Sequence, residues 1–214
     1  YHLVQTLQEL ELVCSALKEA GEFCLDVETT DIRPMHAQLV GIGVGIKAET
    51  AWYIPLNGPL KRDVILEKIK TLLSDPHISI YGHNIKYDLH ALLNAKLPEP
   101  RISFDTILAS YLLTPQNQRH GLDLLTLEKF HIVKTPIEDL IGKGKHQKSM
   151  EDVPLEQIAD YCSQDVDYTI RLKQLFEEEL KKRELEGVLQ EIEIPRIPVL
   201  TRMERKGIFA DPEK

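Results

Sequence analysis

The stretch CLDVETTD, residues 24–31, places two acids at the end of an apolar run. The run ends at Leu25, Asp26 follows, and Glu28 comes two residues later. Alternate side chains of a strand point to the same face. The pattern therefore predicts a buried strand with two carboxylates side by side at its end. Because two like charges so close together repel each other, we expect a neutralising partner nearby.

The bulk composition indicates one globular domain with a short appendage. The chain has 214 residues, which is enough to bury a sizeable core. No apolar run approaches the roughly 20 residues of a membrane span, so we expect no membrane association. The net charge of −8 argues against nucleic-acid binding, unless bound cations reverse the local sign. The cysteines are odd in number and lie in apolar segments, which is typical of reduced core residues in a cytosolic protein.

Hydrophobic periodicity predicts a sheet that begins with the acidic strand. Strands are expected at residues 22–28, 38–46 and 51–56, which form a three-strand meander, and a short strand follows at 78–82. Strands first and helices later are typical of an α/β or α+β sheet covered by helices. Helical spacing is found at residues 4–20, with Thr6 as the cap and Gly21 as the stop, and at 61–74, 84–94, 105–114, 122–130 and 154–183.

Two more acids fall on the apolar faces of predicted helices. Asp88 lies three residues after Ile85 and four before Leu92, on the inward side of its helix. Asp165 shares the apolar stripe of the long helix, and Tyr161 precedes it by four residues. Each acid alone is more commonly a cap or an ion-pair partner.

The four acids taken together favour a metal site. Brought close to one another without cations, they would repel strongly. Clustered carboxylates suit hard ions such as Mg²⁺ or Mn²⁺. Two such ions about 4 Å apart stabilise the attacking and leaving oxygens of a phosphoryl displacement.

Three segments carry the acids in order, with the patterns Asp-x-Glu, Asn-x-x-x-Asp and Tyr-x-x-x-Asp. They resemble the three exonuclease motifs of the proofreading domain in bacterial family A DNA polymerases, the DNA polymerase I family. The resemblance covers essentially the whole chain. It implies a ribonuclease-H-like exonuclease fold of the α/β class, with a mixed central sheet, mostly parallel with one antiparallel edge, and helices on both faces. The matching stretches are LDVETTD, YGHNIKYDLHAL and YCSQDVDYT, with FDTILASYLL, RHGLDLL, IEDLIGKGK and EIEIPRIPVLTRMERKGIFAD beyond them.

The resemblance also implies a two-metal-ion 3′-5′ exonuclease that uses Mg²⁺ or Mn²⁺. Asp26 is expected to bridge both ions. Glu28 and Asp165 would complete the first metal site, which holds the attacking water. Asp88 would hold the second ion near the leaving 3′ oxygen. Tyr161 is expected to orient the nucleophile with Glu28, since a phenol with a pKa of about 10 is a poor general base.

The expected substrate is the 3′ end of single-stranded or frayed DNA, because bases must be splayed for the terminal phosphodiester to reach the metals. Ile137 would supply an apolar wedge where family members often carry phenylalanine. His83 stands where they often carry glutamine. For each substrate residue, packing or a solvated surface is the alternative. The six residues placed near the DNA by the resemblance are Thr29, Ile32, Asn84, Tyr87, Arg119 and Ile137.

The lysines of GKGKHQK are a further candidate for DNA contact. Lys143, Lys145 and Lys148 would follow the phosphate backbone. The alternative is a flexible polar loop, which most charge runs are.

The tail from residue 188 has a different character, because Pro195 and Pro198 interrupt its helical pattern. The resemblance implies an exonuclease domain at 1–187 and the truncated beginning of a polymerase domain at 188–214. The expected partners are DNA and the polymerase domain of the same longer chain, in a monomer of the bacterial cytosol that acts in DNA replication and repair.

Two alternatives stay open. One is an RNA-processing exonuclease of the same superfamily. The other is a catalytically silent domain that braces a polymerase. The presence of all four acids and the tyrosine weighs against the second.

Overall fold

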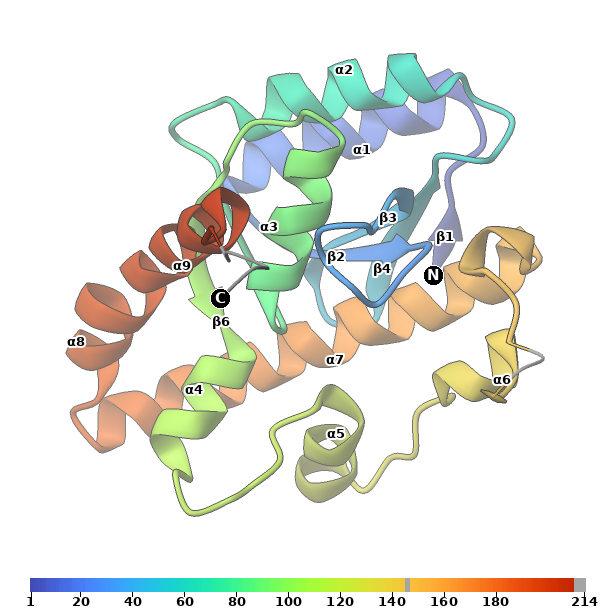
Figure 1. Cartoon of the computed structure of the whole chain (residues 1–214). Coiled ribbons are helices and arrows are strands. Elements are labelled where there is room, and N and C mark those ends of the chain that lie inside the picture. Colours follow the sequence, from blue (N-terminus) through green and yellow to red (C-terminus); the bar gives the residue numbers. More distant parts are fainter. Residues whose placement is uncertain (145–146, 210–214) are drawn as a thin grey trace.

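A six-stranded sheet runs through the centre of the molecule (Figure 1). The computed structural model describes residues 1–144 and 147–209. The strands are β1 (His2–Leu3), β2 (Glu22–Thr29), β3 (Leu39–Lys47), β4 (Thr50–Pro55), β5 (Ser79–Gly82) and β6 (Arg101–Asp105). They lie in the order β1-β4-β3-β2-β5-β6.

The expected meander is present, but its place in the sheet differs from the expectation. β3 pairs antiparallel with both β2 and β4, whereas the pairs β1–β4, β2–β5 and β5–β6 are parallel. β3 therefore runs opposite to the other strands and lies inside the sheet, so the antiparallel edge that the resemblance implied is wrong. The reason is the connectivity, because the middle strand of a meander runs opposite to both of its chain neighbours.

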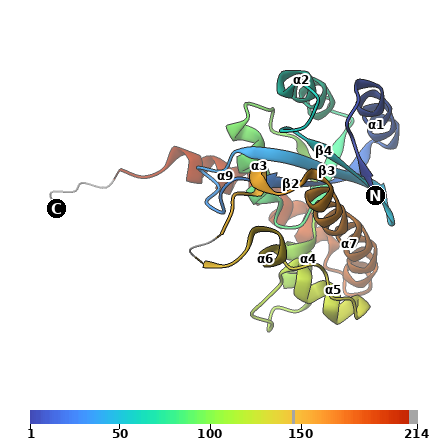
Figure 2. The ribbon, with the colours of Figure 1, turned by 90° about the vertical axis from the view of Figure 1, so that its right-hand side faces the viewer.

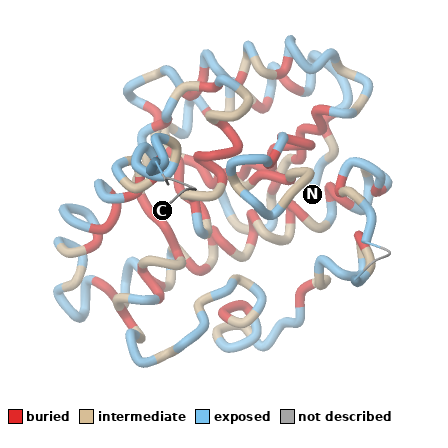
Figure 3. Tube along the Cα trace, viewed as in Figure 1, coloured by how far each residue is buried: buried red, intermediate tan, exposed pale blue. Residues whose placement is uncertain are grey.

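Helices cover both faces of the sheet. They are α1 (Leu7–Ala20), α2 (Arg62–Leu73), α3 (Ile85–Asn94), α4 (Thr106–Leu113), α5 (Leu122–Phe130), α6 (Ile137–Ile141), α7 (Leu155–Lys182), α8 (Glu186–Val188) and α9 (Ile194–Lys206), with a 3-10 helix at Met150–Asp152 and a π-helix at Leu189–Glu193. Figure 2 shows α1 and α2 on one side of the sheet and α7, with α4 and α5 packed on it, on the other. Burial is concentrated along the sheet and the inward side of α7 (Figure 3).

Alternating glycines in β3 let α7 approach the sheet. A Cβ atom at Gly43 would lie 2.4 Å from Cys162 Sγ, and one at Gly45 would lie 2.6 Å from a methyl carbon of Val166. Any side chain at these positions would therefore push α7 away. Asp26 of β2 pairs with Gly43 across the ladder, and cross-strand partners share a face of the sheet. The acidic strand and α7 consequently meet over the glycines of β3.

The tail continues as helix from Glu186 to Lys206 and packs against α3, α4 and β6. The predicted interruption at the prolines is wrong. Pro195 directly follows the π-helix at Leu189–Glu193 as the second residue of α9, and α9 continues through Pro198. Within residues 1–144 and 147–209, no helix combines the length and the apolarity needed to cross a bilayer. The tail buries Leu189, Ile194 and Ile197 in the main core and exposes Ile192, Val199 and Met203.

Candidate active site

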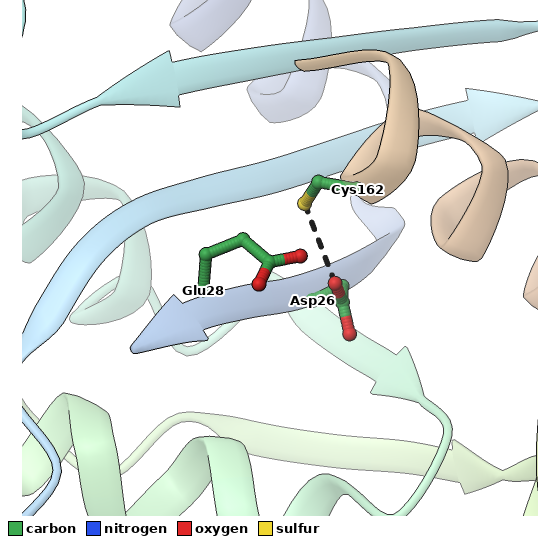
Figure 4. A group of neighbouring side chains, drawn as sticks. All are labelled: Asp26, Glu28 and Cys162. Atoms are coloured by element: carbon green, nitrogen blue, oxygen red, sulfur yellow. Dashed lines mark hydrogen bonds between the residues drawn. The ribbon is translucent and has the colours of Figure 1, made fainter. Parts of the chain in front are cut away.

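The two acids of β2 lie beside a residue of α7. Figure 4 shows the side chains of Asp26 and Glu28 reaching from the strand toward Cys162. One ligand atom from each of these residues lies within 4.8 Å of the other two. Cys162 Sγ donates a hydrogen bond to Asp26 Oδ2 at 3.3 Å. The predicted pair of carboxylates at one strand end is thus present.

The third acid, Asp88, is placed by the start of α3. Its side chain is buried, and its Oδ1 accepts a hydrogen bond from the Val27 N–H at 3.1 Å, which ties α3 to β2. Asp105 orients the start of the helix by accepting from the N–H of Ile85 at 2.9 Å and from that of Asn84 at 3.2 Å. Asn84 itself has a left-handed φ of 60°, which asparagine tolerates better than most residues. The second motif is therefore held to the acidic strand by the hydrogen bond between the Asp88 carboxylate and the Val27 N–H.

The fourth acid, Asp165, comes from α7 together with Tyr161. A single lysine, Lys134, forms an ion pair with Asp165 and lies 3.0 Å from Asp123 Oδ1. The same Nζ lies 5.3 Å from the centroid of the Tyr161 ring. All four predicted acids and the tyrosine thus lie on the three elements β2, α3 and α7.

The electrostatics show strongly interacting buried acids. Burial, and next repulsion from Asp165, raise the pKa of Asp26 to about 7. Burial also raises the pKa of Asp165 to about 6, although Lys134 lowers it. Burial and the charge of Asp26 raise the pKa values of Glu28 and Asp88 well above their usual range. Burial and the charge of Asp165 raise the pKa of Tyr161, so its hydroxyl keeps its proton at neutral pH.

This donor set fits hard divalent cations. The acids supply carboxylate oxygens, and their pKa values are raised first by burial and then by repulsion from neighbouring acids. Magnesium and manganese prefer such oxygen ligands, and a bound cation would reverse the unfavourable sign of the site.

A cavity of about 710 Å³ opens beside the acids. Ile32 lies at its rim with 86% of its surface exposed, and Ile137 begins α6 on its wall. The Tyr87 hydroxyl donates to the carbonyl of Asp31 at 2.5 Å and is hydrogen-bonded to the Thr29 hydroxyl, which fixes this wall. The predicted site residues that line the cavity are Asp26, Glu28, Thr29, Ile32, Tyr87, Ile137, Tyr161 and Asp165.

A second cavity of about 570 Å³ lies on the other side of Tyr161 and Asp165, which line both cavities. Asn84 and Arg119 line this second cavity, so the structure separates them from the other predicted substrate residues. His83 lines it as well, and its Nδ1 is hydrogen-bonded to the Thr106 hydroxyl at 2.8 Å.

Three lysines were expected to contact the phosphate backbone of DNA. Of these, Lys148 lines the first cavity and Lys143 is exposed. Lys145 lies outside the described residues. Sequence reasoning missed Lys134, because a lysine between apolar residues and prolines carries no motif. It also missed Asp105, which accepts hydrogen bonds from backbone N–H groups at the starts of both α3 and α4. The change from strand to helix at Asp105 would have indicated the cap of α4.

Comparison with known proteins decides the family. The sequence profile of a family described as 3′-5′ exonuclease matches residues 1–181. The chain belongs to this 3′-5′ exonuclease family. DNA polymerase I of Pseudomonas aeruginosa is 37% identical over 205 residues, which cover 91% of this chain and 22% of that protein. DNA polymerase I of Chloroflexus aurantiacus is 34% identical over 218 residues, which cover 99% and 23%. The exonuclease chain thus spans less than a quarter of these relatives.

Solved structures share the ribonuclease-H-like exonuclease fold. The polymerase domain of Pol1 from M. smegmatis matches with a TM-score of 0.77 at 18% identity, over 99% of this chain and 33% of that one. NrnC of Brucella melitensis with bound Mg²⁺ matches with a TM-score of 0.71 at 21% identity, over 98% and 96%. Escherichia coli RNase D, an exoribonuclease involved in structured RNA processing, matches with a TM-score of 0.71 at 19% identity, over 98% and 52%.

Proposed function

We propose that this chain removes nucleotides from the 3′ end of single-stranded or frayed DNA and releases deoxynucleoside 5′-monophosphates. One observation carries the proposal: Asp26 and Glu28 of β2 and Tyr161 and Asp165 of α7 line one cavity, and the buried Asp88 of α3 is hydrogen-bonded to the same strand at the Val27 N–H. The family assignment supplies the reaction class, and the relatives supply the expectation that the substrate is DNA.

Two divalent ions, Mg²⁺ or Mn²⁺, would be held by the carboxylates. Asp26, Glu28 and Asp165 would hold the first, and Asp26 with Asp88 the second. When bound, such ions lower the pKa of a water and stabilise the charge that develops on the phosphoryl oxygens. The repulsion among these buried acids supports this assignment, since a bound cation would relieve it.

Tyr161 would orient the nucleophile as a hydrogen-bond donor. Its hydroxyl keeps its proton at neutral pH because burial and Asp165 raise its pKa. Glu28 would accept the hydrogen bond on the other side of the same water. Ile32, Ile137 and the Tyr87 ring would contact the terminal bases from the cavity wall, since apolar and aromatic surfaces hold splayed bases without regard to sequence. Asn84 and Arg119 would contact the strand from the second cavity.

The chain would act within a longer polymerase of the bacterial cytosol. We assign residues 1–187 to the exonuclease domain and 188–214 to the start of the next domain, and we propose a monomer that acts in DNA replication and repair. The relatives support this proposal, because the matched region covers only 22% and 23% of the two DNA polymerases.

The test is digestion of single-stranded DNA labelled at either end, with Mg²⁺, Mn²⁺ or chelator. The proposal expects metal-dependent release of mononucleotides from the 3′ end, and no release by the double variant Asp26→Ala with Asp165→Ala. A matched control, Asp63→Ala with Glu67→Ala, removes two exposed acids of α2 and should cut at the wild-type rate. Unchanged digestion by the Asp26/Asp165 double variant would refute the site. RNA of the same sequence decides between the DNA and RNA substrates, and inactivity on both would favour the bracing domain.

A further inference from the structure

Lys134 is a charged side chain buried inside the active site. It lies in the segment between α5 and α6, and only 1% of its side chain is exposed. Its ammonium forms ion pairs with Asp165 and Asp123, and it faces the ring of Tyr161. Two residues of the proposed catalytic machinery therefore contact one lysine that no motif contains.

Stability alone gives a poor reason for this arrangement. Removing an ammonium and a carboxylate from water costs free energy that their attraction often fails to repay. Lys134 is nonetheless placed on the one acid of α7 that faces the other carboxylates, where a fixed positive charge has a use. A carboxylate gripped at one oxygen cannot rotate freely, and it presents its second oxygen in a constant direction.

The segment that carries Lys134 is fixed to α7 at a second point. The Thr135 N–H donates to Gln164 Oε1 at 3.3 Å, and Gln164 Nε2 donates to Thr135 Oγ1 at 3.4 Å. Gln164 directly precedes Asp165, and α6 begins two residues after Thr135 with Ile137 on the cavity wall. Lys134 thus lies where the metal-binding side of α7 meets the wall of the DNA cavity.

Another lysine of the chain offers a structural counterpart. Lys173, farther along α7, pairs with Glu22 and Glu177 and lies over the Tyr81 ring, with 12% of its side chain exposed. It has two acidic partners and an aromatic neighbour, as Lys134 has, but none of its partners belongs to the acid cluster.

We propose that Lys134 is a positioning residue, which holds Asp165 in the orientation that binds a divalent cation. It also keeps the adjoining cavity wall at a fixed position relative to Asp165. The inference rests on the proposed metal-dependent function. In this role the site is organised by the three acidic motifs and also by Lys134, a positively charged side chain that lies outside all three.

The experiment is calorimetric titration of the whole chain with Mn²⁺ in the absence of DNA. Outer partners of metal ligands typically contribute about 10- to 100-fold in metal affinity. We therefore expect Lys134→Met to raise the Kd for Mn²⁺ by about tenfold or more, and Lys134→Arg to stay within about threefold of wild type because it keeps the charge. Lys173→Met should leave the Kd unchanged.

Lys134→Gln is titrated alongside, because it keeps a polar end and carries the test if Lys134→Met fails to fold by circular dichroism. Wild-type affinity in either variant, or tighter binding, would overturn the role of Lys134 while leaving the proposed function intact. A tenfold loss in Lys173→Met as well would overturn it too, since the effect would then be a general one on α7. Absence of Mn²⁺ binding by the wild-type chain would instead refute the metal site itself, and the role of Lys134 with it.

Discussion

Asp165 and Asp167 lie two residues apart on α7 and have opposite environments. Asp167 accepts hydrogen bonds from the Glu49 N–H at 2.8 Å, from Arg171 Nε at 2.9 Å and from the Tyr1 hydroxyl at 2.8 Å. Burial alone would raise its pKa, but these donors lower it below the usual value. Asp165 has Lys134 as its basic partner, yet burial still raises its pKa to about 6 although the lysine lowers it.

The difference separates a structural acid from a functional one. Asp167 joins α7 to the turn between β3 and β4 and to the N-terminus, and its charge is fully satisfied within the protein. Asp165 and the acids around it repel one another in addition to being buried, and both effects raise the pKa values of Asp26 and Glu28. Burial alone therefore does not identify a site; burial together with unbalanced charge does.

The largest expected effect is on catalysis. Asp165→Asn should lower the rate of 3′ nucleotide release by at least about 100-fold, since even an outer partner of a metal ligand contributes 10- to 100-fold. Asp167→Asn should stay within about twofold of wild type, because its partners lie away from the acid cluster. Single-turnover digestion of labelled DNA measures both. Equal losses of rate in the two variants would contradict the assignment of Asp165 as functional and Asp167 as structural.

The next effect is on stability in chelator at pH 8. Asp26 has a folded-state pKa of about 7, above its ordinary value, so its ionised form destabilises the fold. Asp26→Asn should therefore raise the free energy of unfolding by about 2 to 4 kcal/mol, at 1.36 kcal/mol per pKa unit. With Mg²⁺ present the sign should reverse, because the variant loses a metal ligand. Urea unfolding gives the free energy of unfolding in chelator and with Mg²⁺. If Asp26→Asn were less stable than wild type in chelator, the ionised Asp26 would not be destabilising the fold.

Asp167→Asn should have the opposite effect on stability. Losing hydrogen bonds to an ionised group costs about 1 to 3 kcal/mol, and Mg²⁺ should not change the loss. Since the folded-state pKa of Asp167 is lowered, its contribution is present above the unfolded pKa and disappears as pH falls through the folded one. Urea unfolding at pH 6 and at pH 3 should show the difference between variant and wild type shrinking at the lower pH.

The smallest expected effect concerns the cavity wall. Ile137→Phe adds an aromatic face on the wall of the first cavity. Base stacking on an aromatic ring contributes about 1 to 3 kcal/mol, of which isoleucine already supplies part, so we expect the KM for single-stranded DNA to fall by about threefold to fivefold. Neither Mn²⁺ affinity nor stability in chelator should change. A shift in Mn²⁺ affinity would show that the substitution disturbs the acids as well as the contact with the bases.

The periodic parts of this molecule could be predicted from its sequence. Thr6 and Gly21 bound α1 as expected: the Thr6 hydroxyl accepts from the Glu9 N–H at 3.2 Å, and Gly21 has a left-handed φ of 70°. Helical spacing also placed Asp88 among the buried residues of α3, because three- and four-residue separations are local properties of a helix, whereas Asp165 is only partly buried on α7.

Contacts between residues far apart in the chain could not be predicted from the sequence in the same way. β1 has two residues, and β6 is a short strand before a helix, so neither shows a period; their pairing with β4 and β5 makes them strands. Lys134 lies outside any regular element, and only the tertiary fold brings it to Asp165. The apolar spacing of the tail was also misleading, because Val199 and Met203 lie on its exposed side.

The most direct test of unbalanced charge at the active site is the stability of the wild-type chain at pH 6.5 and pH 8.5, in chelator and with Mg²⁺. Asp26, Glu28 and Asp88 have raised folded-state pKa values, so the stability they provide when protonated is lost as pH rises through those values. His83, with its pKa lowered to about 4, acts in the opposite sense, and most of its effect lies below this window.

In chelator we predict a free energy of unfolding that falls between pH 6.5 and pH 8.5, and with Mg²⁺ a higher value at pH 8.5 that removes the fall. A chelated chain that is equally or more stable at pH 8.5, with no gain from Mg²⁺, would contradict the assignment of the four acids as a metal site.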